Sequence, residues 1–171
     1  MKKFIKILPL LSAALAIVAF GMLFTTAAAF KSDSGVSYTG IEVSFGYVDK
    51  GKSDAGLYLH EFNSTFTGAA IIFLLCGAIA FALAAFSQGF IKNGQAETVL
   101  SILASVFLLA AGILFFLIIE CCSLEPPAEK GELQLGIGSI IGGIASLLAA
   151  ICSAVVVIFK LCNKNKAKKQ A

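Results

Sequence analysis

The side chains that could carry out chemistry are few in this sequence. His60 is the only histidine, and Glu61 follows it. The other candidate ligands nearby are Glu120, Glu125, Glu129 and Glu132. Such residues can bind a divalent cation, but a metal site needs several ligands held at a fixed geometry. One histidine with scattered carboxylates does not meet that requirement, so we interpret these residues as a solvated acidic face and expect no metal site.

Sequence motifs of the common catalytic sites are missing. The chain contains no G-x-S-x-G nucleophile elbow, no H-E-x-x-H metallopeptidase motif and no phosphate-binding loop. The stretch Gly136-Ile137-Gly138-Ser139 is rich in glycine but lacks the lysine that a phosphate loop requires. We therefore predict no catalytic residue, no cofactor and no enzymatic activity.

The five cysteines do not form a redox motif. They are Cys76, Cys121, Cys122, Cys152 and Cys162, and no C-x-x-C pair occurs among them. This spacing argues against a thiol oxidoreductase. Cys76 and Cys152 lie within apolar runs, where cysteine behaves as a small apolar residue. Three states stay open for the adjacent Cys121 and Cys122: free thiols, a bridge between the two, or a bridge to another molecule.

The composition places the chain in a lipid environment. Of its 171 residues, 58% are hydrophobic and 13% are charged, and the mean hydropathy is +0.94. Soluble domains carry about 25% charged residues, so the apolar excess predicts an integral membrane protein. Neither arginine nor tryptophan occurs, which is typical of the codon usage of a low-GC bacterial genome.

Four uncharged runs are long enough to cross a membrane. They cover residues 7–30, 62–91, 98–119 and 133–159. A helix needs about 20 apolar residues to cross a hydrocarbon core of roughly 30 Å, and backbone in lipid must satisfy its own hydrogen bonds. The sequence therefore predicts an all-α integral membrane protein with a four-transmembrane-helix bundle, as a single membrane domain over 1–171. The expected spans are 7–30, 66–91, 98–119 and 136–160.

The placement of lysines predicts the orientation in a cell membrane. With four crossings, nine lysines and one acid, Glu97, share the side of the two termini, whereas four lysines and nine acids lie on the other side. Because lysine is enriched in cytoplasmic loops, both termini are expected to be cytoplasmic. The basic cytoplasmic tail 161–171 is expected to contact lipid headgroups rather than nucleic acid. The tail residues assigned to that contact are Lys164, Lys166, Lys168 and Lys169.

The first run allows a second interpretation. Lys2, Lys3 and Lys6 could begin a signal peptide, and Ala27-Ala28-Ala29 offers a cleavage site before Phe30. The apolar stretch is longer than the usual signal core of about 7–15 residues, which favours a retained helix. Either alternative leaves the following segment outside.

Residues 31–65 form the only sizeable aqueous segment, and their pattern predicts β-structure. Apolar residues alternate with polar or small ones over 41–47, which is the period of a half-buried strand. The alternation extends upstream to Tyr38, and 57–62 is a second strand-like patch, with the composition of a turn over 49–56. We expect a small extracytoplasmic β-hairpin between the first two helices. A lone hairpin is marginally stable, so it should rest on the bundle.

Small residues mark the faces through which the helices should pack. The fourth helix carries a stripe at a spacing of four: Gly138, Gly142, Ser146, Ala150 and Ala154. The third helix offers Ser101, Ser105 and Gly112, and the first offers Ala14, Gly21 and Ala28 at a spacing of seven. Small residues let helices in membranes approach closely. The stripe can serve packing within one bundle or a homodimer through the fourth helix.

These observations favour a non-enzymatic accessory, assembly or self-associating tetraspan protein that acts through helix packing and its outside segment. Its partners would be membrane lipid and another membrane protein or a second copy. The alternative is a subunit of a transporter or channel for a small or apolar solute. The helix centres hold no ionisable residue, which argues against proton coupling. A polar path would therefore depend on Ser101, Ser105, Ser139 and Ser146.

The predicted plan resembles that of claudin-like tetraspan proteins. Four crossings, both termini inside and a longer first outside segment with strand character are the shared features. The resemblance implies a helical bundle that carries an outside β-element. The claudin first segment has a W-GLW-C-C signature, whereas this segment has neither tryptophan nor cysteine, so no functional residue is carried over.

Overall fold

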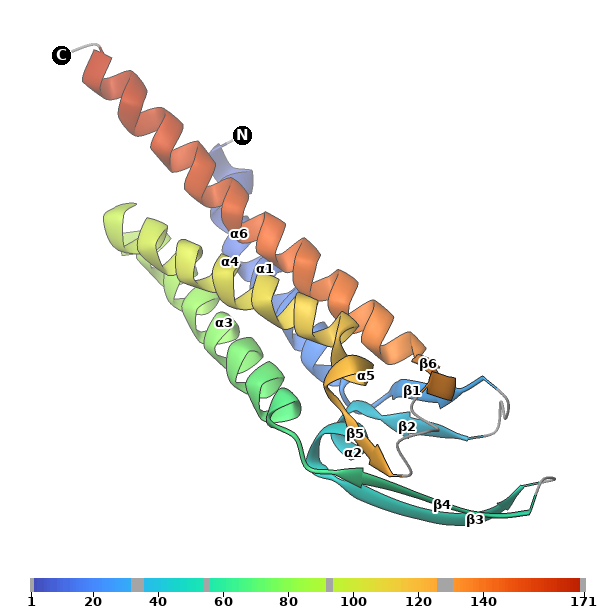
Figure 1. Ribbon diagram of the computed structural model, residues 1–171. Coiled ribbons are helices and arrows are strands. Elements are labelled where there is room, and N and C mark those ends of the chain that lie inside the picture. Colours follow the sequence, from blue (N-terminus) through green and yellow to red (C-terminus); the bar gives the residue numbers. More distant parts are fainter. Residues whose placement is uncertain (1, 32–35, 54–55, 92–93, 126–130, 170–171) are drawn as a thin grey trace.

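Four long helices form a closed bundle in the computed structural model, which describes residues 2–31, 36–53, 56–91, 94–125 and 131–169. They are α1 (Lys2–Met22), α3 (Phe66–Ile91), α4 (Gly94–Phe116) and α6 (Ile137–Lys169). Helices α1 and α4 each pack against both α3 and α6, so the ring runs α1–α3–α4–α6. Each helix is long and apolar enough to cross a membrane (Figure 1).

Two small sheets and two short helices gather at one end of the bundle, which we name the sheet end (Figure 1). One antiparallel sheet has the order β2-β1-β6, from Ser37–Thr39, Thr26–Phe30 and Leu133–Leu135. The other has the order β3-β4-β5, from Tyr47–Ser53, Gly56–Asn63 and Ser123–Glu125. These strands, with α2 (Gly40–Phe45) and α5 (Ile118–Cys121), are the headpiece. Both termini lie at the opposite, terminal end.

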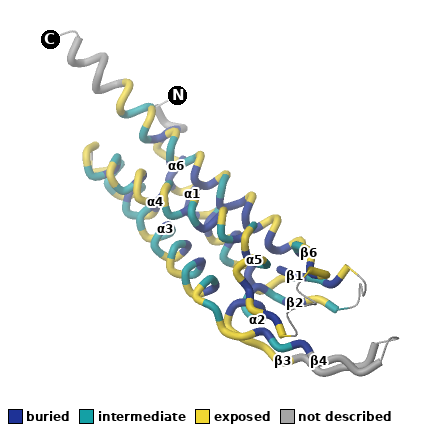
Figure 2. The backbone as a smooth tube through the Cα atoms, viewed as in Figure 1, coloured by how far each residue is buried: buried dark blue, intermediate teal, exposed yellow. Residues whose placement is uncertain are grey.

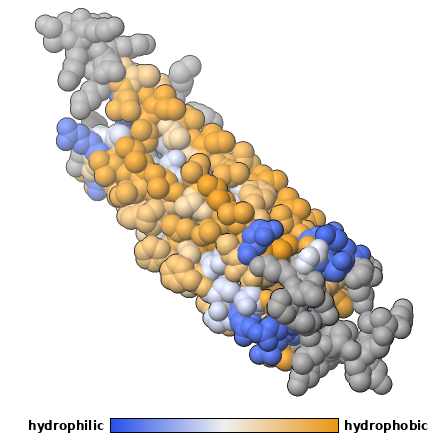
Figure 3. Space-filling model, viewed as in Figure 1, coloured by the Kyte–Doolittle hydropathy of each residue, from blue (hydrophilic) through white to orange (hydrophobic). Residues whose placement is uncertain are grey.

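The bundle packs small residues inside and large apolar residues outside. Ala16, Ala78, Ala111 and Ala149 are fully buried between the helices. The exposed surface carries Ile17, Phe73, Phe90, Val106 and Ile151. Buried and exposed positions follow one another along each helix (Figure 2), and the surface is apolar along the bundle with hydrophilic residues at its two ends (Figure 3). Small residues between closely packed helices are typical of association within lipid.

The first helix is shorter than its uncharged run. The prediction of a span over 7–30 is wrong at its end, because α1 ends at Met22 and Thr26–Phe30 form β1. β1 is the central strand of its sheet and pairs with β2 and β6. Tertiary pairing outweighs the helix propensity of the three alanines 27–29. Cleavage after these alanines, the alternative left open, would remove α1 together with most of β1.

The segment 41–47 is not a strand. Residues 40–45 form α2, and Thr39 caps it: the Thr39 hydroxyl accepts from the amide of Glu42, and the Glu42 carboxylate accepts from the amide of Thr39. This reciprocal pair is a capping box, whose threonine-x-x-glutamate spacing is present in the sequence. The cap explains why the alternation predicts the wrong element here.

The β-structure is also larger than one hairpin. β4 covers the predicted patch 57–62, but residues 49–53 continue β3 instead of turning. β5 and β6 come from the second segment, between the third and fourth spans, and each joins a strand of the first segment. The headpiece is therefore assembled from both segments, rather than from the one between the first two helices.

The remaining helix ends also differ in part from the predicted spans. α3 coincides with 66–91, whereas α4 begins at Gly94 and ends at Phe116, three residues before the predicted end. A break at Leu117 separates α4 from α5. α6 continues as one helix to Lys169, through most of the predicted tail. The side chains of Lys164, Lys166, Lys168 and Lys169 lie outside the described part of the structure.

Candidate functional site

A buried aromatic cluster fastens the two sheets of the headpiece together. The Tyr38 hydroxyl and His60 Nδ1 share a hydrogen bond of 2.8 Å, and the His60 ring stacks on Phe30 with centroids 4.5 Å apart. The Phe62 ring meets Tyr38 edge-on at 4.7 Å. All four side chains are buried. Reading His60 as part of a solvated acidic face is therefore wrong, and this histidine joins β4 to β1 and β2.

The β3–β4 hairpin extends past the end of the bundle (Figure 1). β5 pairs only with residues 61–63 of β4, while β3 pairs with β4 along its whole length. Within the described residues no strand lies on the other side of β3, so β3 is an edge strand. Tyr47 and Val48, at its start, are exposed. An edge strand presents unpaired N–H and C=O groups that can pair with another chain.

The predicted packing residues of the fourth helix lie inside the bundle. A Cβ at Gly138 would sit 2.8 Å from the Thr26 carbonyl oxygen, and one at Gly142 would sit 2.8 Å from the Phe115 ring. Ser146 and Ala150 are buried, and Ala154 is partly buried. The stripe is thus occupied by the chain's own helices, and a dimer through it would require the bundle to open.

The predicted residues of the other helices divide into two groups. On α4, a Cβ at Gly112 would sit 3.0 Å from the Leu147 side chain, and Ser101 is buried. On α1, Ala14 and Gly21 are exposed, and nothing lies within 4 Å of a Cβ at Gly21. The third predicted residue, Ala28, is buried but lies after the end of α1, in β1. The spacing of seven on the first helix therefore misidentifies its packing face. The buried small residues of α1 are Ser12, Ala13, Ala16 and Ala19.

Serine hydroxyls form a polar seam through the interior of the bundle. Ser12 donates to the Ala149 carbonyl oxygen at 2.9 Å and shares a 2.8 Å hydrogen bond with Ser153. Ser105 donates to the Ala150 carbonyl oxygen at 3.1 Å. The hydroxyls of Ser101 and Ser146 are buried and have no hydrogen-bond partner. We name these five serines, together with Ser139, the serine seam: Ser12, Ser101, Ser105, Ser139, Ser146 and Ser153.

Helix α6 arranges its part of this seam at a regular spacing. Ser139, Ser146 and Ser153 are seven residues apart and all buried. Residues seven apart share one face of a helix. Ser139 donates to the Ala27 carbonyl oxygen at 3.2 Å, and the Gly136 amide donates to the same oxygen at 2.8 Å. These two bonds tie the start of α6 to β1.

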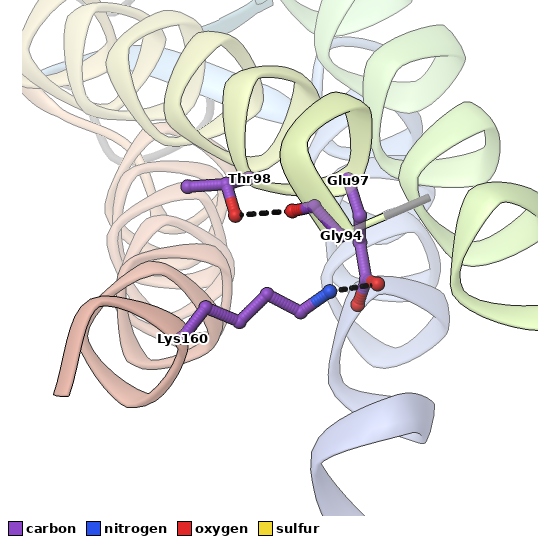
Figure 4. A network of polar contacts seen from close by, with 4 residues as sticks. All are labelled: Gly94, Glu97, Thr98 and Lys160. Atoms are coloured by element: carbon purple, nitrogen blue, oxygen red, sulfur yellow. Dashed lines mark hydrogen bonds and ion pairs between the residues drawn. The ribbon is translucent and has the colours of Figure 1, made fainter. Parts of the chain in front are cut away.

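An ion pair closes the seam at the terminal end. Lys160, seven residues after Ser153, extends its ammonium group to the Glu97 carboxylate of α4 (Figure 4). The exposed fractions of the two side chains are 24% for Lys160 and 6% for Glu97. A Cβ at Gly89 would lie 3.4 Å from the Glu97 carboxylate, so the glycine leaves room for it. A buried carboxylate needs a partner, and Lys160 supplies it.

Sequence reasoning missed this pair, although one signal was present. Glu97 is the only acid on a side with nine lysines, so the sequence offers several candidate partners for it. Which of those lysines pairs with Glu97 depends on the packing of α4 against α6. That packing brings together Glu97 and Lys160, which are 63 residues apart in the sequence. Spacing along the chain does not contain that information.

The cysteines of the second segment differ in exposure although they are adjacent. Cys121 is exposed, Cys122 is buried, and both are free thiols, as is the exposed Cys162 of α6. Cys122 Sγ donates to the Ile119 carbonyl oxygen at 3.0 Å. The bridge between Cys121 and Cys122, one of the open alternatives, is not formed.

Among the described residues, no group of three or more histidine, cysteine, aspartate or glutamate side chains is placed to hold a metal ion. The arrangement offers instead an exposed strand edge, a seam of hydroxyls and a buried ion pair, each held by a helical scaffold. No family model, curated protein or solved structure matches this chain.

Proposed function

We propose that this chain is a non-enzymatic multi-pass protein of the cell membrane that binds another membrane protein, or a second copy of itself, through the headpiece. The observation that carries the proposal is the edge of β3, on a hairpin that extends beyond the bundle. Addition of a strand to such an edge is a common way in which proteins bind one another. The headpiece would lie outside the cell and both termini in the cytoplasm.

The helical bundle would act as the scaffold that orients this edge. The Ala27 carbonyl oxygen accepts two hydrogen bonds from the start of α6, and the aromatic cluster around His60 joins the two sheets. The hairpin is thereby connected through rigid contacts to the helices that cross the membrane. A fixed orientation reduces the entropy that binding costs.

The binding edge is testable with a charge placed on it. We expect Val48→Lys to lower the recovery of a cross-linked partner by about tenfold, which corresponds to about 1.4 kcal/mol. Lysine on an edge strand opposes pairing with another strand. The measurement is quantitative cross-linking in native membranes, followed by mild-detergent capture of the tagged protein. Ser123→Lys, an exposed position on β5, is the matched control and should leave the recovery unchanged. A wild-type protein recovered only as a solitary monomer would contradict the proposal.

The orientation is testable with the protein's own thiols. A membrane-impermeant maleimide applied to intact cells should label Cys121 and spare its buried neighbour Cys122. Cys162, at the opposite end of the bundle, should react only after the cells are permeabilised. The intact mass of the protein reports how many labels it carries. The label added in intact cells should be absent from Cys121→Ser and present in Cys122→Ser. If labelling of intact cells is lost in Cys162→Ser, then Cys162 faces outward and the orientation is the reverse of the one proposed.

A second candidate function is a subunit that passes a small solute. The observation in its favour is the pair of buried hydroxyls of Ser101 and Ser146 that lack a hydrogen-bond partner. A hydroxyl left unpaired in an apolar interior is costly, and a passing polar solute would offer it a partner. Solitary recovery of the wild-type protein, with solute flux in reconstituted vesicles, would favour this function over the first.

A further inference from the structure

We propose that α2 lies within the lipid interface at the sheet end of the bundle, where Phe45 contacts the boundary between phospholipid headgroups and acyl chains. This inference concerns a lipid contact rather than the partner-binding edge. It requires that the four long helices span a membrane, and it does not depend on which side faces outward.

The attachment of α2 fixes its depth. At its start, the Ile41 amide donates to the carbonyl oxygen of Leu23, the residue after the span Ile5–Met22. At its end, the Ser44 carbonyl oxygen accepts from the amide of Thr65, the residue before α3. Both anchors are immediate neighbours of helices that cross the membrane. Helix α2 is therefore tied across the ends of α1 and α3, at the level where their apolar spans end.

The side chains agree with this depth. A Cβ at Gly68, in the first turn of α3, would lie 3.0 Å from the Phe45 ring, so the ring and that turn are at one level. Phe66, the first residue of α3, is 84% exposed, and Phe45 is 42% exposed. One helical turn rises about 5.4 Å, whereas the interfacial layer on each side of the hydrocarbon core is roughly 5–8 Å thick. The ring of Phe45 is thus held within that layer.

Lipid is the occupant that these residues favour. Aromatic side chains are enriched at membrane interfaces, where the ring can be buried while neighbouring polar groups stay hydrated. Phe24, two residues after the end of α1, is exposed at the same boundary, and the exposed surface of α3 continues from Phe66 to Phe73. The segments at this end carry an excess of acids, nine against four lysines. The contact should therefore be apolar in origin and independent of anionic lipid.

The absence of tryptophan from the sequence permits a direct test. Phe45→Trp gives a protein with a single indole, which is reconstituted into phosphatidylcholine vesicles. The lipids are brominated either near the top or near the end of the acyl chains, and bromine quenches nearby indole fluorescence. Phe73→Trp, a residue 68% exposed within α3, is the deep control, and Lys31→Trp, exposed after β1, is the control in water.

We expect the indole at position 45 to lose more fluorescence to the shallow bromines than to the deep ones, with no change when anionic lipid is added. Phe73→Trp should be quenched most by deep bromines, and Lys31→Trp by neither. An indole at position 45 that only aqueous iodide quenches would overturn the proposal. An indole shielded from both quenchers would also overturn it and would indicate a protein occupant, such as a second copy. An unquenched Phe73→Trp would overturn membrane insertion itself.

Discussion

Gly138→Ala is expected to lower the free energy of unfolding by about 3 kcal/mol, the upper part of the range for overpacking a core. The added Cβ would lie 2.8 Å from the Thr26 carbonyl oxygen and 2.9 Å from that of Met22, and it would also meet the Thr25 hydroxyl. Real Cβ atoms do not approach so closely, and backbone oxygens cannot rotate away. The start of α6 must then move from the junction of α1 and β1, which weakens both hydrogen bonds to Ala27.

The measurement is unfolding in mixed micelles, followed by far-ultraviolet circular dichroism. Gly21→Ala is the matched control, because it adds the same methyl group on an exposed face of α1 with nothing within 4 Å. Alanine favours a helix interior over glycine by about 1 kcal/mol, so the control should be unchanged or slightly stabilised. Equal unfolding free energies for the two variants would show that α6 does not pack against the α1–β1 junction as described.

The number and approximate position of the long helices follow from the sequence because their cause is local. A run without charge must be helical in lipid, since the backbone there has no other partner for its hydrogen bonds. The same criterion fails at residues 26–30, where the chain is equally apolar but pairs with two strands. Hydropathy reports burial in an apolar environment and does not distinguish a helix in lipid from a strand within the headpiece.

The headpiece was harder to predict, because its elements depend on distant partners. β5 and β6 are each three residues long and become strands only through pairing with β4 and β1. α2, by contrast, has a local cause that was readable in the sequence, the capping box of Thr39 and Glu42. The strand prediction for 41–47 rests on the alternation of apolar residues and does not take this capping box into account. The His60 cluster and the Glu97–Lys160 pair require the assembled fold, since each joins residues far apart in the chain.

The ion pair at the terminal end should respond asymmetrically to removal of its two members. Lys160→Met leaves the Glu97 carboxylate buried without a partner and is expected to cost about 3–5 kcal/mol of unfolding free energy. Glu97→Gln should cost less, because the Lys160 side chain is four times as exposed and its ammonium group can turn toward water. Unfolding of each variant by the same circular dichroism assay gives the two values.

The double variant Glu97→Gln with Lys160→Met separates the ion pair from packing. Removing both charges leaves no unpaired carboxylate, so this variant should be more stable than Lys160→Met alone. Recovery of stability in the double variant would identify the cost of Lys160→Met as that of an isolated buried charge. A double variant as unstable as the sum of the two single variants would show that the residues act independently. The contact between α4 and α6 at this end would then depend on packing rather than on charge.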